Sequence, residues 1–144
     1  MTSDARARRD DFVASASAGS YIQLHAPRIY EMLTEVAAAR LTVAYSELAE
    51  SIGLDMSNPD HRFQMGEMLD EVNREEHRAG RPMISAVVVH AQEGLPGAGF
   101  FECAPTLSML TTGARQVELA FFVEELRRVH DYWAHKAHSD KSAD

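Results

Sequence analysis

Near the C-terminus, one group of residues has the spacing of a metal site. Asp131, His135 and His138 recur at i, i+4 and i+7, so on a helix they would share one face. Two imidazoles and a carboxylate suit zinc or nickel. This face lies opposite the apolar side that carries Val129 and Trp133, and a solvated helix end accounts for it better. We therefore expect no metal site and no cofactor.

A second candidate is the single cysteine, Cys103, which has Glu102 beside it and His90 earlier in the chain. A reactive thiol needs a base fixed close to the sulfur, and the sequence indicates none. A lone cysteine on a short strand is more typical of a small buried hydrophobe. We therefore expect that the protein is not an enzyme, and unknown chemistry in a pocket beside the strand is the weakest alternative.

Base recognition is the third kind of chemistry that the residues offer. Arg62 and Gln64 stand near the exposed start of an expected helix and carry groups that hydrogen-bond to base edges. Acidic residues follow them on the same helix, and the chain has 22 Asp and Glu against 14 Lys and Arg, a net charge of −8. The whole molecule does not attract phosphate, so any contact with nucleic acid must come from a local patch.

Three helices are predicted before residue 82. Pro27 fits the first turn of one, with apolar residues at helical spacing behind it. A short second helix is expected from the N-cap Ser46 to Gly53. A third begins at Asn58-Pro59, stops at Gly80, and has an apolar side made of Phe63, Met65, Met68, Leu69 and Val72.

After the third helix the pattern changes to that of strands. The β-branched run "MISAVVV" and the segment "FFECA" are predicted to form a hairpin, with Pro96-Gly97 in a type II turn between them. A long helix from about Gln116 to Ala134 follows, with one apolar stripe along Leu119, Phe122, Val123, Leu126, Val129 and Trp133. The predicted class is α+β: a mainly helical, winged-helix-like domain with a β-hairpin wing and a long C-terminal helix.

The two ends are small, polar and charged. We expect residues 1–20 and 136–144 to be disordered tails around one folded domain at 21–135. No apolar run has the ~20 residues that a membrane helix requires. A lone cysteine and the absence of a signal-peptide pattern favour a cytoplasmic location.

The residues also resemble a known family. The stretches "IYEMLTEVAAARLTVAYSELAESIGL", "MGEML" and "RPMISAVVVHAQEGLPGAGFF" look like the C-terminal DNA-binding domain of alkylguanine-DNA alkyltransferases and their non-catalytic alkyltransferase-like relatives. The resemblance covers roughly residues 29–101. It implies a winged helix that binds DNA through its third helix and its wing.

Two departures from that family limit what the resemblance implies. The family's nucleophilic cysteine falls near Val87 or Val88, where the Pro-Cys-His-Arg motif is missing, so no alkyl group should be transferred. The family's arginine that enters the duplex lies three residues before a motif glycine. Here that glycine is Gly66, and Phe63 takes the place of the arginine. Such a phenylalanine could stack on a base, but its helical spacing favours burial in the core.

The sequence therefore predicts a non-catalytic binding domain, with duplex or damaged DNA as the favoured partner. The residues expected to contact DNA are Tyr45, Ser46, Arg62, Gln64, Gly94, Gly97 and Gly99. The alternative is a protein-interaction module, regulatory or defence-related, that presents an acidic surface to a basic protein partner.

Overall fold

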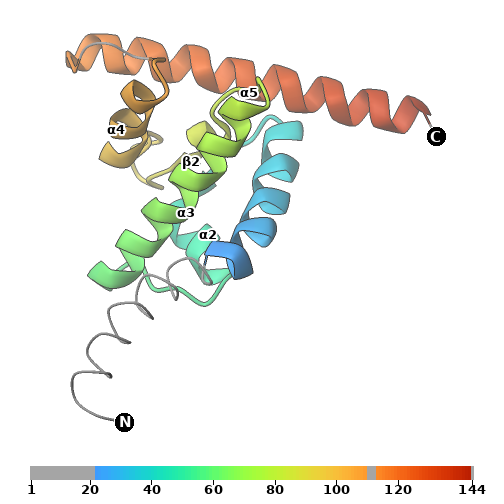
Figure 1. The fold of residues 1–144 in the computed structure, drawn as a ribbon. Helices are drawn as coiled ribbons and strands as arrows, with labels where there is room; N and C mark the ends of the chain where they lie inside the picture. The colour runs from blue at the N-terminus through green and yellow to red at the C-terminus, as the bar shows by residue number, and fades with distance from the viewer. Residues whose placement is uncertain (1–21, 110–112, 144) are drawn as a thin grey trace.

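The described chain is mainly helical, with one small sheet (Figure 1). The computed structural model describes residues 22–109 and 113–143, so the predicted tail at 1–20 lies outside it. A first helix covers residues 22–38. The elements that follow are β1 (Val43–Ala44), α2 (Tyr45–Glu50), α3 (Pro59–Arg78), the 3₁₀ helix η1 (Ile84–Val87), β2 (Val88–Val89), α4 (Ala98–Thr106) and α5 (Arg115–Ala143). The predicted α+β, mainly helical class with a long C-terminal helix is confirmed.

Local signals set both ends of α3, as predicted. The side chain of Asn58 accepts a hydrogen bond of 2.9 Å from the backbone N–H of Asp60, and Pro59 is the first helical residue. After the helix ends at Arg78, Gly80 adopts a φ of +75°, which glycine tolerates without strain. The predicted bounds of α2 were wrong: its N-cap residue is Ala44, two residues before Ser46, and the helix ends at Glu50, before Gly53.

The two strands pair in parallel, with Val43 beside Val88 and Ala44 beside Val89. The predicted hairpin wing is therefore wrong. Part of the run "MISAVVV" forms η1, its last two residues form β2, and the segment "FFECA" lies in α4. In the described residues the only sheet is this parallel pair.

The pattern of α4 explains why the hairpin was the wrong choice. Phe100, Phe101, Cys103 and Ala104 are all buried, at a spacing that places them on one side of a helix. Gly97 precedes this helix with a φ of −75° and a ψ of 174°, so the predicted type II turn at Pro96-Gly97 is also wrong. Short apolar runs fit either a strand or a helix, and tertiary packing decided between them here.

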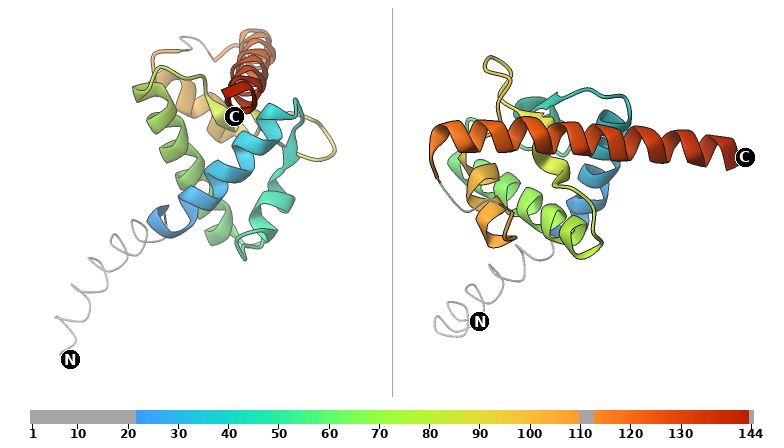
Figure 2. Two further views of the ribbon diagram at one scale, coloured as in Figure 1. Left: turned by 90° about the vertical axis from the view of Figure 1, so that its right-hand side faces the viewer. Right: turned by 90° about the horizontal axis from the view of Figure 1, so that it is seen from above.

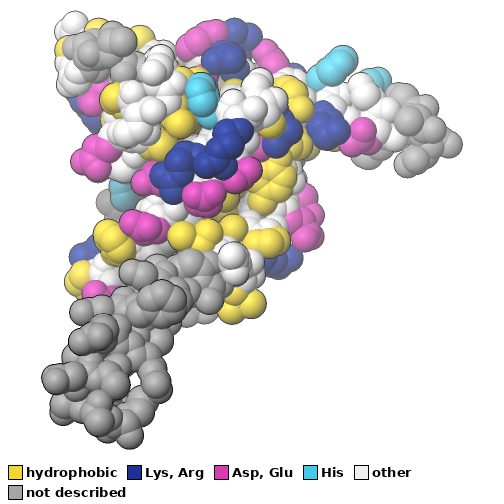
Figure 3. Space-filling model, viewed as in Figure 1, with side chains coloured by type: hydrophobic (Ala, Val, Ile, Leu, Met, Phe, Trp, Pro, Cys, Tyr) yellow, Lys and Arg dark blue, Asp and Glu magenta, His cyan; other side chains and the backbone are white. Residues whose placement is uncertain are grey.

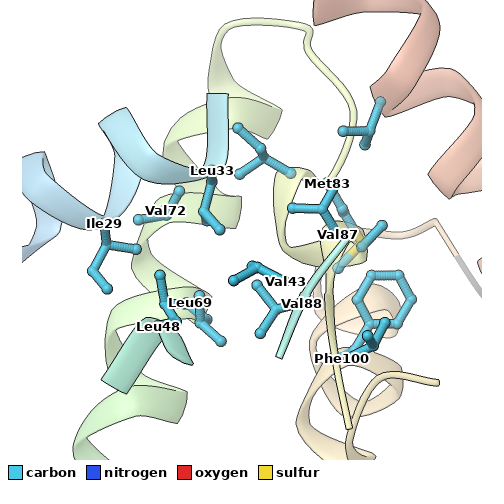
Figure 4. Close-up of a cluster of buried hydrophobic side chains, with 14 of the residues drawn as sticks. Ile29, Leu33, Val43, Leu48, Leu69, Val72, Met83, Val87, Val88 and Phe100 are labelled. Atoms are coloured by element: carbon cyan, nitrogen blue, oxygen red, sulfur yellow. The ribbon is translucent and has the colours of Figure 1, made fainter. Parts of the chain in front are cut away.

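The hydrophobic core lies where the first helix, α2 and α3 meet the two strands. Figure 4 shows Ile29 and Leu33 from the first helix, Leu48 from α2 and Leu69 from α3 in one cluster with Val88. Each such side chain contributes about 1.5–3 kcal/mol when it leaves water. This core fixes the position of α3 relative to the strands and so shapes the surface beside it.

Helix α5 lies across the other elements and extends past them at its C-terminal end (Figure 2). It buries Phe122, Val129 and Trp133 as predicted, whereas Val123, placed on the same stripe by the sequence, is 65% exposed. The helix continues to Ala143, so residues 136–143 are helical instead of forming the disordered tail that we predicted. No helix in the described part of the chain combines the length and apolar character needed to cross a bilayer.

A buried carboxylate attaches α5 to the rest of the fold. Glu125 is 1% exposed. Its Oε2 accepts a hydrogen bond of 2.8 Å from the backbone N–H of Met83, just before η1, and its Oε1 accepts one of 2.8 Å from Arg128. Because η1 also packs against α3, this bond fixes the segment that forms one wall of the site described below.

Candidate functional site

A pocket of about 270 Å³ opens between the N-terminal half of α3 and the start of α4. Helix α3 contributes Arg62, Gly66, Leu69 and Asp70, which recur at i, i+4, i+7 and i+8 and so share one face. Phe100 of α4 forms part of the apolar wall. The pocket is therefore built from segments that are distant in sequence.

Tyr45 and His90 form one side of this pocket. The Tyr45 hydroxyl accepts a hydrogen bond of 2.9 Å from the backbone N–H of Gly97, and the Tyr45 and His90 rings lie 4.8 Å apart between centroids. A Cβ at Gly97 would lie 3.2 Å from His90 Nε2 and 3.4 Å from the Tyr45 hydroxyl. Burial raises the pKa of the Tyr45 phenol, partly offset by the Gly97 hydrogen bond, so Tyr45 is a neutral hydrogen-bonding group at physiological pH.

The opposite wall carries buried polar groups. The side-chain amide of Asn73 donates a hydrogen bond of 2.7 Å to the hydroxyl of Ser85. In return, the backbone N–H of Ser85 donates a hydrogen bond of 3.2 Å to the side-chain oxygen of Asn73. Burial raises the pKa of the half-buried Asp70 carboxyl, and the nearby Arg74 opposes that shift. Ser85 and Asp70 both line the pocket, so its wall offers a hydroxyl and a carboxyl to a ligand.

Cys103 lies behind this wall and is buried. Its thiol interacts with Asp70, Thr106 and Asn73, whereas the sequence suggested His90 and Glu102 as its neighbours. Burial and the charge of Asp70 raise the pKa of this thiol. The thiol is therefore protonated at neutral pH, a state in which it is a weak nucleophile.

The structure brings together four of the seven residues predicted to contact DNA. Tyr45, Arg62, Gly97 and Gly99 line the pocket, whereas Ser46, Gln64 and Gly94 do not. Ser46 is exposed on the first turn of α2. Gly94 adopts a φ of +69° in the loop after β2, where its N–H donates to the carbonyl of His90. Without a hairpin, Gly94, Gly97 and Gly99 do not form a wing.

Phe63 was predicted to be buried, and this prediction is wrong because its side chain is 67% exposed. The buried residues of α3 include Met65, Met68 and Val72. Phe63 precedes Met65 by two positions, which is about 200° around a helix of 3.6 residues per turn. It therefore lies on the far side of α3 from the core, next in sequence to Arg62 at the pocket.

Most arginines of α3 and the following turn are paired with carboxylates. Arg74 lies 2.9 Å from Glu71, Arg78 pairs with Glu75, and Arg81 lies 2.8 Å from the buried Glu76. Figure 3 shows basic and acidic side chains side by side over α3. By contrast, Arg62 donates to the backbone carbonyl of Met56 at 3.0 Å and has no carboxylate within 4.0 Å among the described residues.

Asp131, the carboxylate of the group with the spacing of a metal site, is held by arginines. Asp131 lies 2.8 Å from Arg40 and 2.9 Å from Arg127 in two ion pairs. Across residues 22–109 and 113–143, no three His, Cys, Asp or Glu side chains are placed to hold a metal ion together.

Asp70, Ser85 and His90 are polar residues of the pocket that the sequence analysis did not assign to the DNA-binding site. Asp70 follows from the helical spacing that begins at Arg62, so this signal was present in the sequence. Ser85 and His90 reach the pocket only because η1 and β2 pack against α3 and β1. No local sequence pattern predicts this packing. The chain matches no protein-family model, no curated protein and no solved structure. The resemblance to alkyltransferases therefore stays a prediction.

Proposed function

We propose that this protein binds DNA without catalysis and holds one unstacked base in the pocket between α3 and α4. The observation that carries the proposal is the arrangement at the start of α3. Arg62, which has no carboxylate partner in the described chain, lines the pocket, and the exposed Phe63 stands next to it in sequence. An exposed aromatic ring near a cation suits a strand of nucleic acid, because the ring stacks on bases and the cation contacts phosphate.

The volume of the pocket supports a small planar ligand. At about 270 Å³ it falls below the ~300 Å³ at which pockets for drug-sized ligands begin. Leu69 and Phe100 supply apolar surface for the faces of a ring, and Asp70 and Ser85 supply hydrogen-bonding groups for its edge. Proteins that extract a base from a duplex use this combination of stacking surface and polar edge contacts.

A binding role agrees with the chemistry of the site. Val87 and Val88, where the family resemblance places a nucleophilic cysteine, are fully buried aliphatic residues. The hydroxyl of Ser85 is hydrogen-bonded to an amide, which cannot act as a general base. The thiol of Cys103 is kept protonated, as described above.

The proposal is tested by fluorescence anisotropy with labelled duplexes of one length. One duplex is fully matched, one has a central mismatch and one has a central alkylguanine. We expect micromolar binding near physiological salt and tighter binding to the two distorted duplexes, because an unpaired or damaged base costs less to unstack. Mass spectrometry of the same mixtures should show no alkyl group on the protein.

Two pairs of variants separate contacts at α3 from general effects of surface mutation. Phe63→Ala and Arg62→Ala should weaken binding. The matched controls on α5, Val123→Ala for an exposed apolar side chain and Arg127→Ala for an exposed arginine, should not. If no duplex binds at low salt, or if all four variants behave alike, DNA recognition at this site is wrong and the acidic interaction surface becomes the better hypothesis.

A further inference from the structure

A second cavity, called the groove below, lies between the first helix and the C-terminal half of α3. It is formed by residues that do not line the proposed DNA site. Its volume is about 530 Å³. Ile22, Ala26 and Pro27 of the first helix and Val72 of α3 give it apolar walls. Glu71, Glu75 and Glu76 also line it, and the only basic lining residue among those described is Arg81.

Glu76 is the unusual residue of this groove, because its side chain is fully buried and only half satisfied. Its Oε1 accepts hydrogen bonds of 2.9 Å from the Tyr30 hydroxyl and 3.0 Å from Arg81 Nε. Its Oε2 has no hydrogen-bond partner. Among the described residues, the only other buried side-chain polar atom in this state is Nε1 of Trp133, which does not line the groove.

An unsatisfied carboxylate oxygen in a buried position is costly, and a donor that reaches it recovers that cost. Arg81 and Tyr30 are both committed to the other oxygen, so the described chain supplies no such donor. The missing group must be a hydrogen-bond donor, and a positively charged N–H donor forms the stronger bond to a carboxylate. Its remainder must be apolar to lie against Ile22, Ala26 and Val72.

We propose that this groove binds an alkylammonium group, whose three N–H donors include one for Oε2 of Glu76 while its aliphatic stem lies on the apolar walls. A lysine side chain of a partner protein and a free aliphatic amine share this chemistry. An ammonium is compact and rotates its donors freely, so it suits a single free oxygen better than the planar fork of a guanidinium does. The carboxylates of Glu71 and Glu75 at the groove disfavour an anionic ligand.

The probe is n-butylammonium chloride added to the full-length, ¹⁵N-labelled protein, with 1-butanol as the neutral control of the same length. We expect saturable shifts of the amide resonances of Ile22, Ala26 and Val72 with the ammonium and much smaller ones with the alcohol. The fluorescence of Trp133, the only tryptophan, should change as well, because its ring packs 5.8 Å from that of Tyr30, which donates to Glu76. Equal shifts with both probes, or shifts spread over all surface carboxylates, would overturn the proposal.

Variants test the role of the free oxygen. Glu76→Gln replaces the carboxylate with an amide of the same shape and should weaken butylammonium binding by about tenfold or more. Ala26→Leu narrows the groove and leaves Glu76 intact, so it keeps the test decisive if Glu76→Gln does not fold. Glu124→Gln, an exposed carboxylate on α5, is the matched control and should bind as the parent does. Unchanged binding in both groove variants would contradict the proposal.

A final comparison separates the two sources of the ammonium. If a partner's lysine occupies the groove, N-acetyl-lysine N-methylamide should bind more tightly than butylammonium, because its backbone amides add contacts at the open rim. If a free amine is the ligand, butylammonium should bind more tightly. Failure of both probes rejects the site. It leaves the DNA proposal untouched, because that proposal depends on the other pocket.

Discussion

At the scale of single residues, Gly97 and Gly99 show how two glycines in one pocket play different roles. A methyl group at Gly97 would press on His90 and the Tyr45 hydroxyl, whereas one at Gly99 would meet no atom within 4 Å. Gly97 has an ordinary negative φ, so an alanine there brings no backbone strain. Its effect must come through the side chains that it displaces.

We expect Gly97→Ala to lower the free energy of unfolding by about 1–3 kcal/mol, the usual cost of overpacking a close contact. Gly99→Ala should instead raise it by about 0.5–1 kcal/mol, because alanine is the better residue inside a helix. Urea denaturation of both variants beside the parent protein measures the difference. A stabilising Gly97→Ala would show that the contact between Tyr45 and His90 is loose.

Asp70 provides a pH-dependent test of the pocket wall. Burial raises the pKa of this carboxyl in the folded chain above its ordinary value of 3.8. Between the ordinary pKa of 3.8, which applies to the unfolded chain, and the raised pKa of the folded chain, the folded state binds more protons than the unfolded state. The free energy of unfolding therefore falls as pH rises through this window. The free energy of unfolding of Asp70→Asn, relative to the parent protein, should therefore increase from below pH 3.8 to neutral pH.

Asp131→Asn is the control of opposite sign. A hydrogen bond from Arg40 lowers the pKa of the Asp131 carboxyl below 3.8, so this group contributes stability that is lost on acidification. The stability of this variant relative to the parent should decrease as pH rises toward 3.8 and stay constant above it, because Asp131 is ionised in both the folded and the unfolded state there. If both variants followed the same trend with pH, the burial effect assigned to Asp70 would be wrong.

At the scale of elements, Glu125 attaches α5 to the segment before η1 through a buried hydrogen bond. Glu125→Ala leaves the backbone N–H of Met83 buried without its acceptor and should cost about 1–3 kcal/mol of stability. The neighbouring Glu124 pairs with Arg127 in solvent, so Glu124→Ala should leave the melting temperature unchanged. Thermal unfolding followed by circular dichroism compares the two, and equal losses would indicate that α5 is held by its apolar face alone.

The elements that the sequence predicted correctly are those with local signals. Asn58, Pro59 and Gly80 mark the ends of α3 with residues that act on their own backbone. The position of Val88 beside Val43 and the helical form of Phe100 depend instead on contacts made across the fold. The same division applies to the pocket. Arg62 was predicted from its place on a helix, whereas Ser85 and His90 depend on how η1 and β2 are packed.

At the scale of the whole molecule, charge limits how strongly this protein can hold DNA. The net charge of −8 and the paired arginines of α3 leave few cations for phosphate. We expect the logarithm of affinity to fall with the logarithm of salt concentration at a slope of about two to four, from ~0.9 per phosphate neutralised. Anisotropy titrations between about 50 and 200 mM salt give this slope. A slope near zero would indicate that phosphates are not contacted at all.

The parallel pairing of β1 with β2 also constrains the order of events during folding. Val43 and Val88 lie 45 positions apart (88 − 43), so closing the chain between them costs roughly 3 kcal/mol of entropy before any contact compensates. Helices with strong local signals, α3 above all, should form earlier because their hydrogen bonds join near neighbours. The strands, with two residues each, then join only after α3 has brought them together. Truncation of Val88 should therefore speed unfolding much more than it slows folding.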